Sequence, residues 1–171
     1  PLADTVAAFE TLKASGKLRH WGVSNLDVDD IDELSDANDG GNCVSNQVLY
    51  NLGSRGIDFD LVPDHGKRGI MIMAYSPLGQ GAILRNPALA KVAAKHHVTP
   101  AAIAIAWTMR HPNVVAIPKA ATLAHVQDNA AAADLVLGAD DLAELDAAFP
   151  PPKRKTSLGM LCAQAPHRLA V

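Results

Sequence analysis

Amide and aromatic side chains follow three apolar runs of this chain. Ser24 and Asn25 come after the first run, Gln47 ends the second, and Tyr75 ends the third. Two carboxamides that converge offer paired donors and acceptors to a planar amide ligand. The flat ring of Tyr75 could stack on an aromatic ligand. These residue types therefore predict recognition of a flat ligand that carries an amide.

A second set of residues has the chemistry of an anion site. The loop Ser76–Gly81 has glycines without side chains, so its backbone N–H groups can approach an anion closely. Lys119 follows a later apolar run and precedes Thr122, which can cap a helix. A cation beside a helix N-terminus, after a late strand, is the usual composition of a phosphate site in a βα barrel.

Each of these residues also has an ordinary structural interpretation. Ser24 and Asn25 form turns readily, Tyr75 could belong to the core, and Lys119 could be a surface charge. The four segments nevertheless occur in order, each at the end of an apolar run. This arrangement favours a binding site on one rim.

Strands and helices alternate along the sequence and must position these side chains. The apolar runs predict strands at His20–Ser24, Asn42–Val48, Ile70–Tyr75 and Val114–Ile117. Apolar spacing predicts helices at Ala3–Ser15, Ile57–Arg68, Pro87–Lys95 and Asp140–Ala148. Capping residues predict three more helices: one that begins after Asp27, one from Thr99 through Arg110 and one from Thr122 through Ala132. This alternation predicts one α/β domain with a parallel sheet and right-handed crossovers, of the TIM-barrel type.

Composition excludes several other classes of protein. Hydrophobic residues make up 49% of the 171 residues and charged residues 19%, which is typical of a globular domain. The net charge of −3 argues against nucleic-acid binding, and no apolar run approaches the length of a membrane span. Cys43 and Cys162 belong to no CxxC motif, and the seven histidines do not cluster at ligand spacing, so we expect no disulfide and no metal site. Solvated or capping histidines, reduced thiols and a cytoplasmic location are the simplest interpretation.

The motifs WGVSN, NQ, AYSPLGQG and IPKA together resemble the C-terminal half of the aldo-keto reductase family. Members of that family are (β/α)8 barrels that reduce aldehydes and ketones with NAD(P)H. The resemblance covers residues 1–152, implies only the last four βα units of the barrel, and leaves residues 153–171 as an exposed extension. It implies NADPH as cofactor, with NADH possible, and a small carbonyl compound as substrate.

The resemblance also implies roles for individual residues. The nicotinamide carboxamide would be held by Ser24, Asn25 and Gln47, and its ring would stack on Tyr75. The pyrophosphate would lie under the loop of Ser76, Pro77, Leu78, Gly79 and Gln80. The adenosine 2′-phosphate would face Lys119, and the adenine end would be held by His125, Asp128 and Asn129.

Two departures from the family pattern affect cofactor preference. Ala120 stands where many members have Ser, and His125 stands where many have an Arg that stacks on adenine. An imidazole lacks the fixed guanidinium fork that binds a phosphate. We therefore expect a weakened preference for NADPH, which Lys119 still favours.

A third departure concerns catalysis. The catalytic Tyr, Lys, Asp and His of the family come from its first four βα units, which no segment here resembles, and Tyr50 falls in a substrate-loop position. We therefore name no catalytic residue. The first helix has no preceding strand and the chain starts at Pro1 without Met, which indicates truncation. An inactive nucleotide-binding or interaction module and a truncated gene product remain as alternatives to a reductase.

A half-barrel would also leave its interior face without a partner layer. Parallel sheets are normally covered on both faces, and bare edges favour pairing with other chains. We expect this exposure in parts of Trp21–Val23 and of Met71–Tyr75. The chain should then self-associate or bind a separate N-terminal half.

Overall fold

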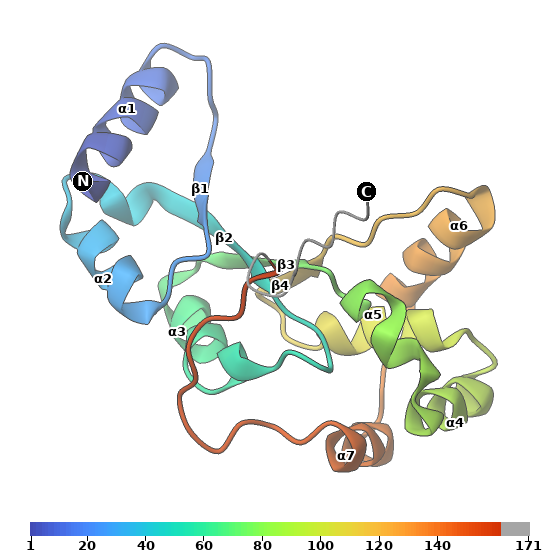
Figure 1. Cartoon of the computed structure of the whole chain (residues 1–171). Coiled ribbons are helices and arrows are strands. Elements are labelled where there is room, and N and C mark those ends of the chain that lie inside the picture. Colours follow the sequence, from blue (N-terminus) through green and yellow to red (C-terminus); the bar gives the residue numbers. More distant parts are fainter. Residues whose placement is uncertain (162–171) are drawn as a thin grey trace, which may run out of the picture.

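Four parallel strands form the centre of the protein, and they lie in the sheet in the order of the chain (Figure 1). The computed structural model describes residues 1–161. The strands are β1 (Trp21–Ser24), β2 (Cys43–Leu49), β3 (Met71–Tyr75) and β4 (Val114–Ala116). Each strand pairs in parallel with the next. The prediction of a parallel α/β fold is confirmed.

Helices connect and flank these strands, close to the positions that the sequence predicts. They are α1 (Leu2–Ala14), α2 (Val28–Asp36), α3 (Leu61–Arg68), α4 (Pro87–His96), α5 (Pro100–Thr108), α6 (Leu123–Ala131) and α7 (Ala139–Ala148), with short 3-10 turns η1 (Gly40–Asn42), η2 (Gly56–Asp58), η3 (Gly79–Arg85) and η4 (Ala132–Asp134). The predicted caps are present at Asp27, Thr99 and Thr122. Their side chains accept hydrogen bonds from backbone N–H groups that a helix leaves unpaired.

The prediction of a single helix over Ile57–Arg68 is wrong. The segment divides into η2 and α3, because Asp60 caps α3 by accepting a hydrogen bond from the backbone nitrogen of Leu61 at 2.9 Å. Pro63 then becomes the third residue of α3. A proline is tolerated there because the first-turn nitrogens have no partner within the helix.

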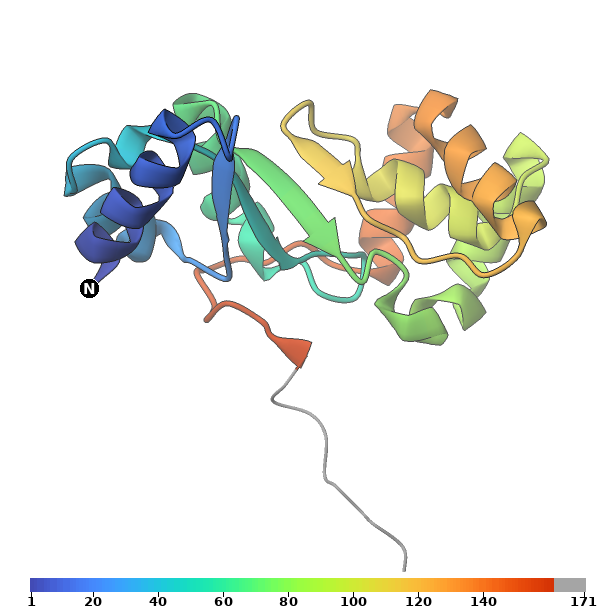
Figure 2. The same ribbon diagram turned by 90° about the horizontal axis from the view of Figure 1, so that it is seen from above.

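The two faces of the sheet differ in how far they are covered. Val48, Ile72 and Val114 belong to one face and lie in the main core with residues of α3, α4, α5 and α7. The opposite face is open: Met71 and Val115 are each 39% exposed. Seen from above, α1 and α2 gather at one end of the sheet and α4–α7 at the other (Figure 2).

Trp21 is not among the exposed parts of the segment Trp21–Val23. It is 5% exposed, because its ring stacks on Phe9 of α1 with centroids 5.2 Å apart. Its Nε1 also donates a hydrogen bond to Glu10 at 2.6 Å. The predicted bare face is therefore confined to the middle of the sheet and to β4.

The described part of the C-terminal extension lies against the body of the protein. Lys155 forms ion pairs with Asp27 at 3.4 Å and with Asp60 at 3.5 Å, so it bridges the caps of α2 and α3. Leu158 packs on the main core, while residues 153–157 are exposed. Residues 162–171, including Cys162, lie outside the described residues.

Candidate functional site

The turn after β1 is fixed to the end of β2. Ser24 Oγ donates a hydrogen bond to the carbonyl oxygen of Gln47 at 2.9 Å, and the backbone nitrogen of Asn25 donates to the same oxygen at 2.9 Å. Asn25 has φ of +55°, a left-handed conformation that asparagine adopts more readily than most residues. The structure thus brings together three of the residues that the sequence predicts.

A buried asparagine and histidine hold this turn from below. Asn46 is fully buried, and its Nδ2 donates to the carbonyl oxygen of Leu26 at 2.7 Å and lies 3.1 Å from His65 Nε2. Burial lowers the pKa of His65, which favours the neutral ring whose Nε2 accepts this contact. His65 Nδ1 lies 3.3 Å from the Asp64 carboxylate, so its proton faces that group.

Sequence reasoning missed both of these residues. The prediction that the histidines are solvated or capping is wrong for His65, which is fully buried. Asn46 is part of the NQ motif but received no role of its own. A usable signal existed, because Asn46 shares a strand face with the core residue Val48, and a buried amide there needs partners.

Tyr75 joins the ends of β1 and β3. Its hydroxyl donates to Asn25 Oδ1 at 3.3 Å, and its ring is half-buried rather than part of the core. Ser24 and Gln47 line a hollow of about 530 Å³ on the open face, together with Met73. Residues of α1 close the opposite side of this hollow.

The loop after β3 turns sharply through left-handed conformations. Ser76, Gly79, Gln80 and Gly81 have φ of +50°, +53°, +54° and +86°. The backbone nitrogen of Gly79 donates to the Ser76 carbonyl at 2.9 Å, and that of Gly81 donates to the Leu78 carbonyl at 2.8 Å. The loop is therefore wound into the start of η3 rather than extended.

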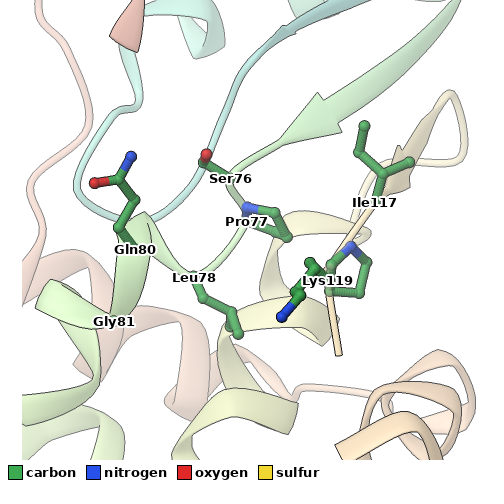
Figure 3. A pocket seen from close by; sticks show the side chains of 8 residues that line it. Ser76, Pro77, Leu78, Gln80, Gly81, Ile117 and Lys119 are labelled. Atoms are coloured by element: carbon green, nitrogen blue, oxygen red, sulfur yellow. The ribbon is translucent and has the colours of Figure 1, made fainter. Parts of the chain in front are cut away.

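A cavity of about 410 Å³ separates this loop from the segment after β4. One wall consists of Ser76, Pro77 and Leu78, and the opposite wall contains Ile117 and Lys119 (Figure 3). The side chain of Gln80 points away from Lys119 (Figure 3). Lys119 is exposed and forms no ion pair with any of residues 1–161, so its ammonium group is available to an anion.

The residues predicted for the adenine end lie farther along, on α6. His125 is exposed, Asp128 and Asn129 are half-buried, and none of the three lines the cavity beside Lys119. The backbone nitrogen of His125 donates to Thr122 Oγ1 at 3.3 Å, which fixes the start of the helix. The structure therefore unites the loop with Lys119, but it leaves these three side chains outside that cavity.

Tyr50 does not occupy a substrate loop, and that prediction is wrong. It is fully buried beside Trp107, its hydroxyl donates to the Asp58 carboxylate, and Arg110 Nη1 donates to the hydroxyl at 2.6 Å. Burial raises the pKa of this hydroxyl, and Asp58 raises it further. A group so enclosed cannot reach a ligand on the rim.

The described residues contain no group of three or more His, Cys, Asp or Glu side chains placed to hold a metal ion. The side chain of His96 instead contacts the Asp141 carboxylate at 2.8 Å, and the buried Cys43 has a thiol whose pKa is raised by burial. Among residues 1–161, no helix has the length and apolarity that a membrane crossing requires.

Comparisons with known proteins identify the family to which the chain is similar. The model of the aldo/keto reductase family matches residues 1–149. The chain is 50% identical over 163 residues to methylglyoxal reductase YeaE of Escherichia coli strain K12, a match covering 92% of this chain and 57% of that protein. It is 35% identical over 145 residues to glyoxal reductase of Bacillus subtilis strain 168, covering 84% and 51%.

The chain has the same fold as the matching part of a solved aldo/keto reductase structure. An aldo/keto reductase from Klebsiella pneumoniae, crystallised with NADP and acetate, superposes with a TM-score of 0.90 at 48% identity. The match covers 94% of this chain and 59% of that one, so this chain spans little more than half the length of its relatives. The predicted partial barrel is confirmed.

Proposed function

The chain belongs to the aldo/keto reductase family, and we propose that it binds NADPH along the carboxyl ends of β1–β4 as the cofactor-binding part of a carbonyl reductase. The observation that carries this proposal is the cavity between the Ser76–Gly81 loop and Lys119. The similar Klebsiella pneumoniae enzyme was crystallised with NADP and, in a second structure, with NADPH. These two complexes support the same class of cofactor for this chain.

The residues around the cavity fit the phosphates of such a cofactor. Gly79 and Gly81 have positive φ, so a side chain at either position would be strained, and no Cβ blocks the backbone. On the opposite wall, Lys119 would face the 2′-phosphate, which NADPH carries and NADH lacks. An exposed ammonium on one wall of a cavity supplies the positive charge that a phosphate attracts.

The turn after β1 and the end of β3 fit the nicotinamide end. Asn25 and Gln47 would pair with the carboxamide, and the half-buried face of Tyr75 would support the ring. His125, Asp128 and Asn129 would hold the adenine end from α6. When bound, NADPH supplies a hydride to the carbonyl carbon of the substrate.

Small 2-oxoaldehydes are the substrates that we propose to test first. The relatives named above are a methylglyoxal reductase and a glyoxal reductase. Methylglyoxal reduction is therefore the appropriate first assay for a reductase that includes this chain.

The chain by itself should bind NADPH without turning over a carbonyl substrate. It has two tyrosines: Tyr50 is enclosed by Asp58 and Arg110, and the hydroxyl of Tyr75 is bonded to Asn25. Neither is placed to give a proton to a substrate on the open face. This observation favours a second candidate function, nucleotide binding without catalysis.

The open face of the sheet supports a further element of the proposal. We infer that additional βα units, or a second copy of the chain, cover Met71 and Val115, because parallel sheets are normally buried on both sides. A monodisperse monomer by light scattering, together with a well-dispersed amide spectrum, would contradict this inference.

Two experiments test the function. Fluorescence titration with NADPH should give saturable binding by the chain, with NADH binding more weakly. NADPH-dependent reduction of methylglyoxal should be absent with the chain alone and present with a form that is extended upstream. If the extended form binds NADPH but reduces no carbonyl compound, the enzyme assignment fails and the binding module remains.

A further inference from the structure

Asn51 is a buried polar residue that the binding site described above does not include. It follows β2 by two residues and is 2% exposed. Its Nδ2 donates to the carbonyl oxygen of Ser76 at 2.9 Å, and its Oδ1 accepts from the backbone nitrogen of Gly53 at 2.9 Å. One amide thus links the loop after β2 to the loop after β3.

The Ser76 carbonyl is the point at which the loop after β3 is set. Ser76 has φ of +50°, which a residue with a side chain adopts only where its surroundings hold it. Its carbonyl accepts from Asn51 Nδ2 and from the backbone nitrogen of Gly79. Two donors on one oxygen fix the orientation of the peptide unit with which the loop begins.

Close packing around the amide leaves it little freedom to move. A Cβ atom at Gly53 would lie 3.3 Å from Asn51 Oδ1 and 3.1 Å from Ile83 Cγ2. A Cβ atom at Gly79 would lie 3.7 Å from Asn51 Oδ1 and 3.2 Å from Ile83 Cγ2. The amide of Asn51 and the methyl of Ile83 therefore occupy the space between two glycines, one from each loop.

The backbone of Asn51 is fixed as firmly as its side chain. Its nitrogen donates to the Ser54 carbonyl at 3.3 Å, and the Ser54 nitrogen donates to the Asn51 carbonyl at 2.9 Å. The side chain therefore projects from a closed turn. Its two bonds need one donor and one acceptor, which a carboxamide provides and a carboxylate does not.

We propose that Asn51 is a positioning residue that holds the Ser76–Gly81 loop in the conformation that binds the cofactor phosphates. The proposal rests on the function proposed above for that loop. Asn51 acts through the Ser76 carbonyl and need not touch the cofactor. It therefore adds a residue from the loop after β2 to a phosphate site whose other parts follow β3 and β4.

The test compares Asn51→Asp with Asn113→Asp. Asn113 is a matched control, because its Nδ2 also donates to a backbone carbonyl, that of Val62 at 3.1 Å, but it precedes β4 at the opposite end of the strands. Both variants lose one amide donor and gain an acidic group. Asn51→Ala is the milder alternative, since it introduces no charge near the Ser76 oxygen.

The first measurement is amide hydrogen exchange in the free full chain. We expect exchange at Gly79 and Gly81 to accelerate in the Asn51 variants and to stay near the wild-type rate in Asn113→Asp. The second measurement is the Kd for NADPH, which should rise about tenfold in Asn51→Asp, as expected for the loss of a buried hydrogen bond and the approach of a carboxylate to the Ser76 oxygen. The Tm of each variant separates a loss of loop order from a loss of global stability.

Unchanged exchange at Gly79 and Gly81, or equal acceleration in Asn113→Asp, would overturn the proposal. The proposal would also be overturned if the Kd rose only in variants whose Tm falls, because the weaker binding would then reflect a loss of global stability. If the wild-type chain does not bind NADPH, the proposed function fails for this chain. The exchange rates then still decide whether Asn51 holds the loop.

Discussion

Replacing Lys119 with Gln should weaken NADPH binding and leave NADH binding almost unchanged. Lys119 lines the cavity beside the Ser76–Gly81 loop and pairs with no carboxylate among residues 1–161. NADPH differs from NADH by the 2′-phosphate alone. The change therefore removes one cation and should affect only the cofactor that carries this group.

The exposure of Lys119 sets the size of the expected effect. Two unit charges 4 Å apart attract by about 1 kcal/mol in water and by about 4 kcal/mol at the effective dielectric of a protein surface. The Lys119 side chain is exposed, so its attraction to the phosphate should lie near the value for water. A phosphate monoester carries a charge of about −1.5 to −2, which makes the attraction stronger than that of two unit charges. We expect a loss of about 1–2 kcal/mol, or a Kd about 5 to 30 times higher.

Parallel fluorescence titrations with NADPH and NADH measure this effect. Lys91→Gln is the control, because Lys91 is an exposed cation on α4 that pairs with Glu144 away from the cavity. Raising the salt from about 0.1 M to 1 M shortens the screening length from about 10 Å to 3 Å. The preference of the wild type for NADPH over NADH should then fall toward that of Lys119→Gln. An equal loss of affinity for NADPH and NADH would refute the reasoning, since Lys119 would then support the loop rather than bind the 2′-phosphate.

Two further predictions concern stability. Asp58→Ala leaves the buried guanidinium of Arg55 and the half-buried one of Arg110 without their shared carboxylate, so the free energy of unfolding in urea should fall by about 3–5 kcal/mol. Asp32→Ala removes an exposed ion pair and should cost less than about 1 kcal/mol; similar losses for both would contradict this reasoning. Hydrogen bonds from Lys95 and His96 lower the pKa of Asp141 from 3.8 to about 2, so the stability that this carboxylate provides is complete above pH 4 and is lost as the pH falls toward 2. The wild type should therefore exceed Asp141→Asn in unfolding free energy at pH 6, with a difference that narrows toward pH 2, and a constant difference would count against the assignment.

The elements of the fold could be predicted because their signals are local. An apolar run identifies a strand such as Met71–Tyr75, and Thr99 followed by Pro100 identifies the start of α5. The error over Ile57–Arg68 has a local cause too, since the capping carboxylate of Asp60 lies inside the predicted helix. Residues that end an apolar run could likewise be assigned to the rim from sequence alone.

The residues that support the rim could not be predicted in the same way. Asn51 bonds to Ser76, and Asn46 to Leu26 and His65, and these partners lie 19 to 25 residues away in the chain. A polar residue inside an apolar pattern indicates that a partner exists, but only the packed structure identifies it. Tyr50 illustrates the same limit, because its position after Gln47 does not reveal that Asp58 and Arg110 enclose it.

Most of the contacts that shape the rim join neighbouring βα units. Ser24 bonds to the end of β2, Asn51 bonds to the loop after β3, and the cavity beside Lys119 lies between the loops after β3 and β4. Each of these links is internal to the four units. The open face differs, because Met71 lies on it without a covering layer in the described residues. It follows that cofactor binding should depend less on a covering partner than the stability of the sheet does.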